Sequence, residues 1–241
     1  MTCKLSVNLN KIALIRNARG RDYPSLDYFA KKALAAGAHG VTIHPRPDQR
    51  HARYSDIAAL RQLVRAYPGA ELNVEGFPDE MFMSQVLAAR PDQCTLVPDE
   101  PGQLTSDHGW DLSRHLDQVR TVVARLRAAG IRASIFMDPD PAQIALAPAT
   151  GADRIELYTE AYAHAPSAAS LAPYAEAARQ AAQLGLGVNA GHDLNLDNLA
   201  AFIAAVPEVV EVSIGHALTV EALEFGFETT VRRYAAILDP S

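Results

Sequence analysis

Short runs of β-branched and other apolar residues alternate with longer, Ala-rich segments along the whole chain. Several runs are apolar at nearly every position, as is typical of strands buried on both faces of a parallel sheet. Val41-Thr42-Ile43 and Ala133-Ser134-Ile135-Phe136 are examples. The pattern predicts eight strands, at residues 4–10, 40–45, 71–77, 93–99, 131–139, 153–159, 187–194 and 209–217.

Between these runs the apolar positions recur with the period of a helix. Residues 26–36 place Leu26, Ala30 and Ala33 on one face, and residues 112–129 continue a similar stripe. Residues that commonly begin or end helices flank such segments. We expect N-caps at Ser25, Ser55 and Asp79, and helix-ending glycines at Gly37, Gly130, Gly151 and Gly185.

Eight strand–helix units in 241 residues leave about 30 residues for each unit, close to the smallest βαβ repeat. We therefore predict an α/β fold, a (β/α)₈ TIM barrel with extra short helices, in which residues 1–241 form one domain. An open, doubly wound parallel sheet is the alternative, because periodicity does not show closure. The long interval from residue 93 to residue 131 predicts an extra loop or short helix above the fourth strand.

Composition narrows the class of protein. The 22 Lys and Arg residues against 28 Asp and Glu residues give a formal charge of −6, which argues against broad nucleic-acid binding. No apolar stretch reaches the ~18–20 residues of a membrane span, and the first residues lack the apolar core of a secretory signal. Two cysteines do not form a disulfide framework. We expect a reduced, cytoplasmic protein without a membrane partner.

Polar residues gather where the predicted strands end, whereas strand beginnings are mostly Gly, Ala or surface charge. His39 is an exception at a strand beginning and is interpreted as structural. In a barrel of this type the carboxyl ends of the strands surround the active site. The strand-end residues are Asn8, Asn10, Lys11, His44, Arg46, Asn73, Glu75, Asp99, Asp138, Glu156, Tyr158, Asn189, His192 and His216.

His44, His192 and His216, together with Glu75, form a candidate acid–base set on this rim. Imidazoles titrate near neutral pH, and burial raises the pKa of a carboxyl toward that range. Each residue alone is commonly a packing or ion-paired group, but four on one rim favour proton-transfer chemistry. A zinc site built from the same side chains is the alternative, although neither H-x-H on the first strand nor H-E-x-x-H is present.

Two arginine-rich segments, 16–21 and 46–51, follow the first and second strands. Guanidinium groups bind phosphate oxygens through two hydrogen bonds, and Gly191 and Gly215 would leave backbone N–H groups free for the same purpose. Solvated charged loops are the alternative. Lys11 is a Schiff-base candidate, with a phosphate-pairing or surface role as the alternative. The residues alone thus indicate a barrel enzyme that acts on small phosphorylated substrates by acid–base chemistry.

Gly185-Leu186-Gly187-Val188-Asn189-Ala190 matches the spacing of a dinucleotide-binding motif. It leads from a helix into a strand, whereas the motif runs from a strand into a helix. We interpret it as the end of a helix.

Several motifs, in the same order and spacing, resemble the bacterial pyridoxine 5′-phosphate synthase family. The resemblance runs from about Leu5 to the final helix. The matching segments are Asn8-x-Asn10-Lys11-Ile12-Ala13-x-x-Arg16-Asn17-Ala18-Arg19-Gly20, His44-x-Arg46-x-Asp48-x-Arg50-His51, Asn73-x-Glu75, Leu96-Val97-Pro98, Asn189-Ala190-Gly191-His192 and Ile214-Gly215-His216-Ala217.

The resemblance implies a (β/α)₈ barrel assembled as a homo-octamer, a tetramer of dimers. It implies condensation of 1-deoxy-D-xylulose 5-phosphate with 3-amino-2-oxopropyl phosphate to pyridoxine 5′-phosphate, inorganic phosphate and water. The amine would attack the sugar ketone to form an imine, and loss of water and phosphate would precede ring closure. No metal or organic cofactor is expected.

The resemblance also implies residue roles. His44 and Glu75 would accept protons and His192 would donate one. Asn8, Arg19, Gly215 and His216 would hold the amino-ketone phosphate, with Arg19 reaching in from a neighbouring subunit as one possibility. The deoxyxylulose phosphate would contact Asn10, Lys11, Arg46, His51 and Thr105, and segment 99–111 would form a lid.

The chain departs from the family pattern at several positions. Asn10-Lys11 replaces the Asp-His of many members, and Tyr158-Thr159-Glu160 replaces His-Thr-Gly. We place Asp193 in the binding set, although it stands where the family has Gly and is expected to point outward. These changes keep open a non-catalytic relative that binds a phosphorylated metabolite.

Overall fold

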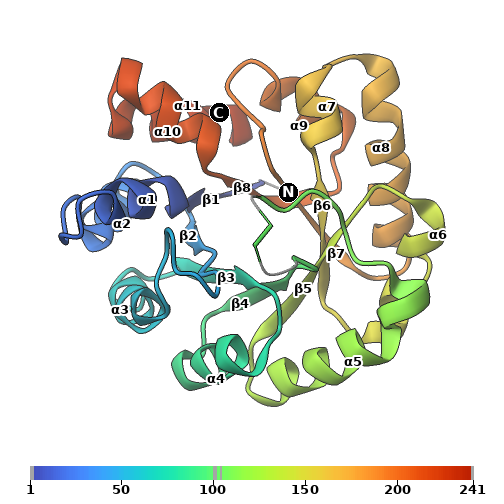
Figure 1. Cartoon of the computed structure of the whole chain (residues 1–241). Coiled ribbons are helices and arrows are strands. Elements are labelled where there is room, and N and C mark those ends of the chain that lie inside the picture. Colours follow the sequence, from blue (N-terminus) through green and yellow to red (C-terminus); the bar gives the residue numbers. More distant parts are fainter. Residues whose placement is uncertain (1–2, 100–101, 104, 240–241) are drawn as a thin grey trace.

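Eight parallel strands close into a barrel in the order in which they occur along the chain (Figure 1). The structure is a computed structural model that describes residues 3–99, 102–103 and 105–239. Closure comes from β8 pairing with β1, and it confirms the predicted barrel rather than an open sheet. The strands are β1 (Lys4–Asn8), β2 (Gly40–Ile43), β3 (Glu71–Gly76), β4 (Gln93–Leu96), β5 (Arg132–Met137), β6 (Arg154–Tyr158), β7 (Gly187–Gly191) and β8 (Val209–Ile214).

Helices surround the barrel, and short ones are added to the basic repeat (Figure 1). Asn10, predicted at the end of the first strand, instead begins the short helix α1. The helices are α1 (Asn10–Asn17), α2 (Leu26–Ala35), α3 (Tyr54–Val64), α4 (Glu80–Ala89), α5 (Leu112–Ala128), α6 (Pro141–Ile144), the 3₁₀-helix η1 (Ala147–Thr150), α7 (Glu160–His164), α8 (Ala168–Gln183), α9 (Leu199–Ala205), α10 (His216–Phe225) and α11 (Phe227–Leu238).

Local chemistry explains several helix ends. The side chains of Ser25 and Asp79 accept the backbone N–H groups of Tyr28 and Phe82, as expected of N-caps. Ser55 is not an N-cap, because α3 begins one residue earlier and the side chain of Asp56 accepts the N–H of Arg53. The four helix-ending glycines all adopt the left-handed conformation that glycine tolerates best; they are Gly37, Gly130, Gly151 and Gly185.

The segment between β4 and α5 is a loop over its described residues, not a short helix. Trp110 anchors it, because its indole N–H donates to the carbonyl of Leu96 at 2.9 Å and its backbone N–H donates to Phe136. Gly109 packs so closely on β5 that a Cβ atom there would lie 2.3 Å from the backbone nitrogen of Asp138. The loop is thereby fixed to the barrel just before α5.

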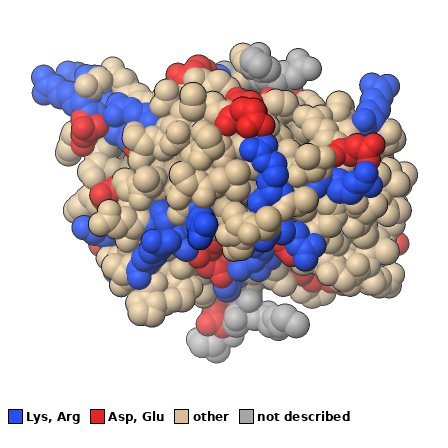
Figure 2. Space-filling view, turned by 90° about the horizontal axis from the view of Figure 1, so that it is seen from below, with Lys and Arg blue, Asp and Glu red and all other residues tan. Residues whose placement is uncertain are grey.

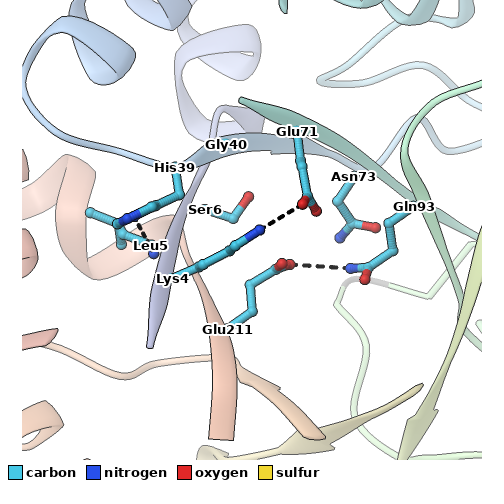
Figure 3. A pocket seen from close by; sticks show the side chains of 9 residues that line it. All are labelled: Lys4, Leu5, Ser6, His39, Gly40, Glu71, Asn73, Gln93 and Glu211. Atoms are coloured by element: carbon cyan, nitrogen blue, oxygen red, sulfur yellow. Dashed lines mark hydrogen bonds and ion pairs between the residues drawn. The ribbon is translucent and has the colours of Figure 1, made fainter. Parts of the chain in front are cut away.

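Apolar side chains fill the layer between strands and helices. The lower end of the barrel interior, where the strands begin, is instead polar. Figure 3 shows Lys4, Glu71, Gln93 and Glu211 pointing toward one another there. Lys4 and Arg132 both pair with Glu71 at 2.6 Å, and Gln93 donates to Glu211 at 3.1 Å. This polar cluster at the strand beginnings was not predicted from the sequence. His39 is structural as predicted, since its Nδ1 accepts the N–H of Leu5.

Among the described residues, no helix has the length and apolar character needed to cross a membrane.

Candidate active site at the barrel mouth

His44 and Glu75 face each other at the carboxyl end of the barrel. Glu75 lies near the end of β3, and His44 directly follows β2. Nδ1 of His44 is 3.9 Å from Oε2 of Glu75, and both residues are buried. The backbone N–H of His44 donates to the side chain of Asn10 at 2.8 Å, which fixes the start of this loop. The sequence correctly predicted that these two side chains meet on one rim.

Burial disfavours the charged form of both groups. It lowers the pKa of His44 well below its usual value, and the positive charges of Arg46 and Arg50 add to the effect. It raises the pKa of Glu75 well above its usual value, helped by the nearby Glu156 carboxylate. The separation of 3.9 Å is longer than a hydrogen bond, so the two side chains face each other without a direct hydrogen bond. The mouth thus holds an imidazole of lowered pKa beside a carboxyl of raised pKa.

Glu156 extends this site into the barrel, and the sequence interpretation did not place it among the site residues. It is buried in β6, and burial together with Glu211 raises its pKa to about 8. Thr95 links it to Asn73 through contacts of 3.3 and 3.1 Å, and Asn73 lies 3.5 Å from Glu75. A carboxyl that alternates with apolar neighbours in a buried strand was the signal available in the sequence.

His192 lies on a strained turn at the end of β7. Its φ is 89°, and Asp193 follows with φ 61°, a region that residues with a side chain rarely occupy. The hydroxyl of Thr159 lies 2.8 Å from the carbonyl oxygen of Gly191 and 2.6 Å from that of His192. Strain held by such contacts is common where a side chain must be aimed at a ligand.

Two further contacts aim the His192 ring. Its Nε2 lies 3.0 Å from the hydroxyl of Thr105 in the loop after β4, so the predicted binding residue and the predicted proton donor meet. Its Nδ1 lies 3.2 Å from the carboxylate of Asp193. Asp193 therefore does not simply point outward, as expected, but faces the imidazole. The pairing explains how a negative charge is accommodated at this rim.

Asn8 and Gly215 meet beside Glu75. The Asn8 amide donates to Glu75 at 3.5 Å, and its Oδ1 accepts the N–H of Asn10. A Cβ atom on Gly215 would lie 2.9 Å from Cβ of Asn8, so only glycine fits without movement. His216 is exposed at the first position of α10, whose N-terminus opens beside this contact. Free backbone N–H groups at a helix N-terminus favour an anion.

The second arginine segment is tied to the loop that follows β4. Arg46 pairs with the buried carboxylate of Asp99, which also accepts the hydroxyl of Ser106 at 2.9 Å. Asp99 lies 3.7 Å from Nε2 of His44. Burial, with the charges of Arg46 and neighbouring cations, lowers the pKa of His51 to about 4. The predicted binding residues Arg46 and His51 thus lie close to His44.

The first arginine segment is only partly available for a ligand. Arg16 is buried and makes two hydrogen bonds with Asp56, at 2.8 and 2.9 Å, so it is structural rather than part of a phosphate cradle. Asn17 donates to the backbone carbonyl of His51, at 2.7 Å. Arg19 is exposed in the turn after α1, and Lys11 is half-buried in the first turn of that helix. Of this segment, Arg19 remains a phosphate-binding candidate.

No three His, Cys, Asp or Glu side chains of the described residues are arranged as a metal-binding group. The four residues considered for zinc therefore do not form such a set in this structure. Their arrangement fits proton transfer, with an imidazole of lowered pKa, a carboxyl of raised pKa and a second imidazole around one opening.

Comparison with solved structures shows the same fold at low sequence identity. Tryptophan synthase from M. tuberculosis has a TM-score of 0.67 at 13% identity, over 99% of this chain and 94% of that chain. A mutant tryptophan synthase alpha-subunit from Pyrococcus furiosus has a TM-score of 0.59 at 13% identity. The match covers 98% of this chain and 97% of that chain. These likenesses support the barrel and say nothing of its chemistry.

Sequence comparison is more specific. A curated pyridoxine 5′-phosphate synthase from Brucella abortus is 51% identical over 244 residues, covering 99% of this chain and 99% of the relative. Another, from Albidiferax ferrireducens, is 54% identical over 243 residues, covering 97% of this chain and 96% of the relative. The family model described as "Pyridoxal phosphate biosynthesis protein PdxJ" matches residues 5–240. The chain therefore belongs to the PdxJ family of pyridoxal phosphate biosynthesis proteins.

Proposed function

We propose that the barrel mouth catalyses the reaction for which these relatives are named, the synthesis of pyridoxine 5′-phosphate. The substrates would be 1-deoxy-D-xylulose 5-phosphate and 3-amino-2-oxopropyl phosphate, and inorganic phosphate and water would be released. The observation that carries the proposal is the buried, closely spaced pair of His44 and Glu75 on the rim.

Imine formation, dehydration and aromatisation each move protons between carbon, nitrogen and oxygen. A neutral imidazole accepts such protons, which suits His44 because its pKa is lowered. Glu75, with a raised pKa, is a stronger base when ionised and exchanges its proton nearer to neutral pH. His192 would donate a proton to a leaving oxygen from across the mouth. These steps require no redox group, so we propose that the reaction proceeds without a metal or organic cofactor.

The phosphate groups of the two substrates need two separate binding sites, each with cationic side chains or free backbone N–H groups. Asn8, Gly215 and His216 at the N-terminus of α10 would hold the amino-ketone phosphate, together with Arg19. The sugar phosphate would lie on the other side of His44. Its proposed ligands are Asn10, Lys11, Arg46, His51 and Thr105, and Asp193 would orient His192 beside them.

The loop after β4 would cover the bound substrates, since Thr105 links it to His192 and Asp99 links it to Arg46. A closed mouth would exclude water, which hydrolyses imines. The lid would correspond to residues 99–111, of which 100–101 and 104 lie outside the described residues.

Apolar side chains exposed on neighbouring helices support self-association. Leu14 and Ile15 of α1 are 42% and 49% exposed, and Val220 and Leu223 of α10 are 47% and 81% exposed. The two helices pack together, and Arg19 follows the first of them. We propose that this face joins subunits of a homo-octamer and brings Arg19 near a neighbouring mouth. We also propose a cytoplasmic location, which suits the free, buried Cys3 and Cys94.

The test is incubation of the purified chain with both substrates. Pyridoxine 5′-phosphate and inorganic phosphate should appear in equal amounts, and treatment with a chelator should not change the rate. Binding of one substrate without any product would instead assign a non-catalytic role. Loss of activity on chelation, restored by zinc, would assign the metal-dependent alternative.

A further inference from the structure

A second basic pocket lies outside the barrel, at the end opposite the mouth. It has a volume of about 450 Å³ and is bordered by the last residues of α3, α4 and α5 and the first residues of β3 and β5. Figure 2, seen from the side on which α4 and α5 lie in Figure 1, shows Lys and Arg side chains gathered in the lower half of this face. The arginine pocket is lined by Arg61, Arg65, Arg90 and Arg132, with Glu71 and Asp92.

The four arginines differ in how far they are already paired. Arg132 pairs with Glu71 at 2.6 Å, and Arg61 pairs with Asp92 at 2.5 Å. The Nε of Arg61 is nevertheless buried without a hydrogen-bond partner among the described residues. Neither the Arg65 nor the Arg90 guanidinium has a partner in the described parts of the chain. The pocket therefore offers two free guanidinium groups, those of Arg65 and Arg90.

The backbone at Arg90 points to a use for its side chain. Arg90 ends α4 in the left-handed conformation, with φ 52° and ψ 66°. Glycine is the usual residue at such a position because any side chain is strained there. An arginine at this position adds a cation to the pocket at the expense of backbone strain.

The balance of charges around the pocket also favours a bound anion. Four arginines and two carboxylates leave a balance of 4 − 2 = +2 around the arginine pocket. The carboxyl ends of α3, α4 and α5 oppose this by about 1.5 unit charges in total. The pocket therefore stays positive on a chain whose formal charge is −6. Its volume leaves room for a phosphate group, and the overall negative charge of the chain disfavours a nucleic acid.

We propose that the arginine pocket binds a phosphate monoester or inorganic phosphate, at a site separate from the barrel mouth. Guanidinium forks match the geometry of a phosphoryl group, which accepts paired hydrogen bonds from them. Arg65 and Arg90 would supply the free forks. The bound anion would share Arg132 with Glu71.

The test is equilibrium dialysis of the whole chain against labelled inorganic phosphate at low ionic strength. The double variant Arg65→Ala/Arg90→Gly removes both free forks, and glycine suits the backbone at position 90, so the variant should be no less stable than the parent. The matched control is Arg120→Ala/Arg179→Ala, which removes two exposed arginines from other helices. The parent should bind one phosphate per chain in this pocket. The affinity of this site for phosphate should fall by about tenfold or more in the double variant and should be unchanged in the control.

Location and ligand class are tested separately. A crystal soaked in tungstate, a heavy phosphate mimic, should show the anion between Arg65, Arg90 and Arg132. Glycerol 3-phosphate should compete with labelled phosphate, whereas phosphatidic acid vesicles and a short DNA oligonucleotide should bind no better to the parent than to the double variant. Unchanged phosphate affinity in the double variant, or preferential binding of vesicles or DNA, would overturn the proposal. Turnover of the two proposed substrates should be unchanged, so failure here is distinguishable from failure of the proposed function.

Discussion

Glu75 and His44 lie 3.9 Å apart, between Oε2 and Nδ1, in a buried position at the top of the barrel. Burial moves their pKa values in opposite directions, down for the imidazole and up for the carboxyl. Both shifts disfavour the charged form of the group concerned. This relationship suits the proton-transfer roles that we propose for His44 and Glu75.

Replacing either member of this pair should slow the chemical step. We expect His44→Asn and Glu75→Gln each to reduce kcat by at least about 10²-fold, the lower range for a positioned acid or base. In the parent, the apparent pKa of the acid limb of the pH profile of kcat/KM should lie below about 6.5, the ordinary imidazole value. The reason is that the pKa of His44 is lowered. Steady-state assays over a pH series measure both effects.

The matched control for Glu75→Gln is Glu176→Gln, which alters an exposed carboxylate on α8. It should leave kcat and the pH profile unchanged. Near-parental kcat in both His44→Asn and Glu75→Gln would remove these residues from the mechanism.

Thr159 should be a positioning residue for His192. Its hydroxyl holds the carbonyls of the turn on which His192 adopts φ 89°. We expect Thr159→Val to reduce kcat by about tenfold with little change in KM, because loss of a positioning contact misplaces the donor. Thr159→Ser retains the hydroxyl and should recover most of the activity. Equal loss in the Val and Ser variants would show that the hydroxyl is not the reason.

Glu156 should make the folded state less stable as pH rises. Its pKa is about 8 in the folded chain against an ordinary 4.5, so the folded state retains the proton longer than the unfolded state. Its contribution to stability is full below the ordinary value and is lost as pH rises through about 8. We expect Glu156→Gln to raise Tm at about pH 9 and to change it little at about pH 4.

Thermal unfolding of Glu156→Gln and the parent at both pH values measures this difference. The same Tm shift at both pH values would contradict the raised pKa of Glu156.

Arg16 should contribute to stability rather than to phosphate binding. Removing one partner of a buried ion pair leaves the other uncompensated, so Arg16→Met should lower the free energy of unfolding by about 3 kcal/mol. Arg120 forms an exposed pair with Asp117, and Arg120→Met should change that free energy by less than about 1 kcal/mol. Urea denaturation compares the two. Similar small effects would mean that the Arg16–Asp56 contact is not structural.

The strands were predictable because a buried parallel strand leaves a local mark, a short apolar run such as Val41-Thr42-Ile43. Closure of the barrel followed from the number of such runs and the length of the chain. The polar lower end of the barrel was not predicted. Glu71 and Glu211 are far apart in sequence, and only closure places their partners Arg132 and Gln93 beside them.

The rim site was predictable in part because chain order fixes which strand ends share a rim, and His44, Glu75 and His192 all follow that rule. Whether an arginine faces a ligand or a carboxylate is a long-range property. Arg16 meets Asp56 40 residues away, a pairing that no local pattern reveals. Glu156 was passed over because its raised pKa depends on Glu211 and on burial, which exist only in the fold.

The most direct test is a crystal structure of the chain soaked with 1-deoxy-D-xylulose 5-phosphate. We predict that the sugar occupies the barrel mouth, with its ketone within hydrogen-bond distance of His44 or Glu75 and His192 on the opposite side. Its phosphate should lie near Arg46 and His51. A sugar phosphate bound only outside the mouth, with His44 and Glu75 making no contact to it, would contradict the account.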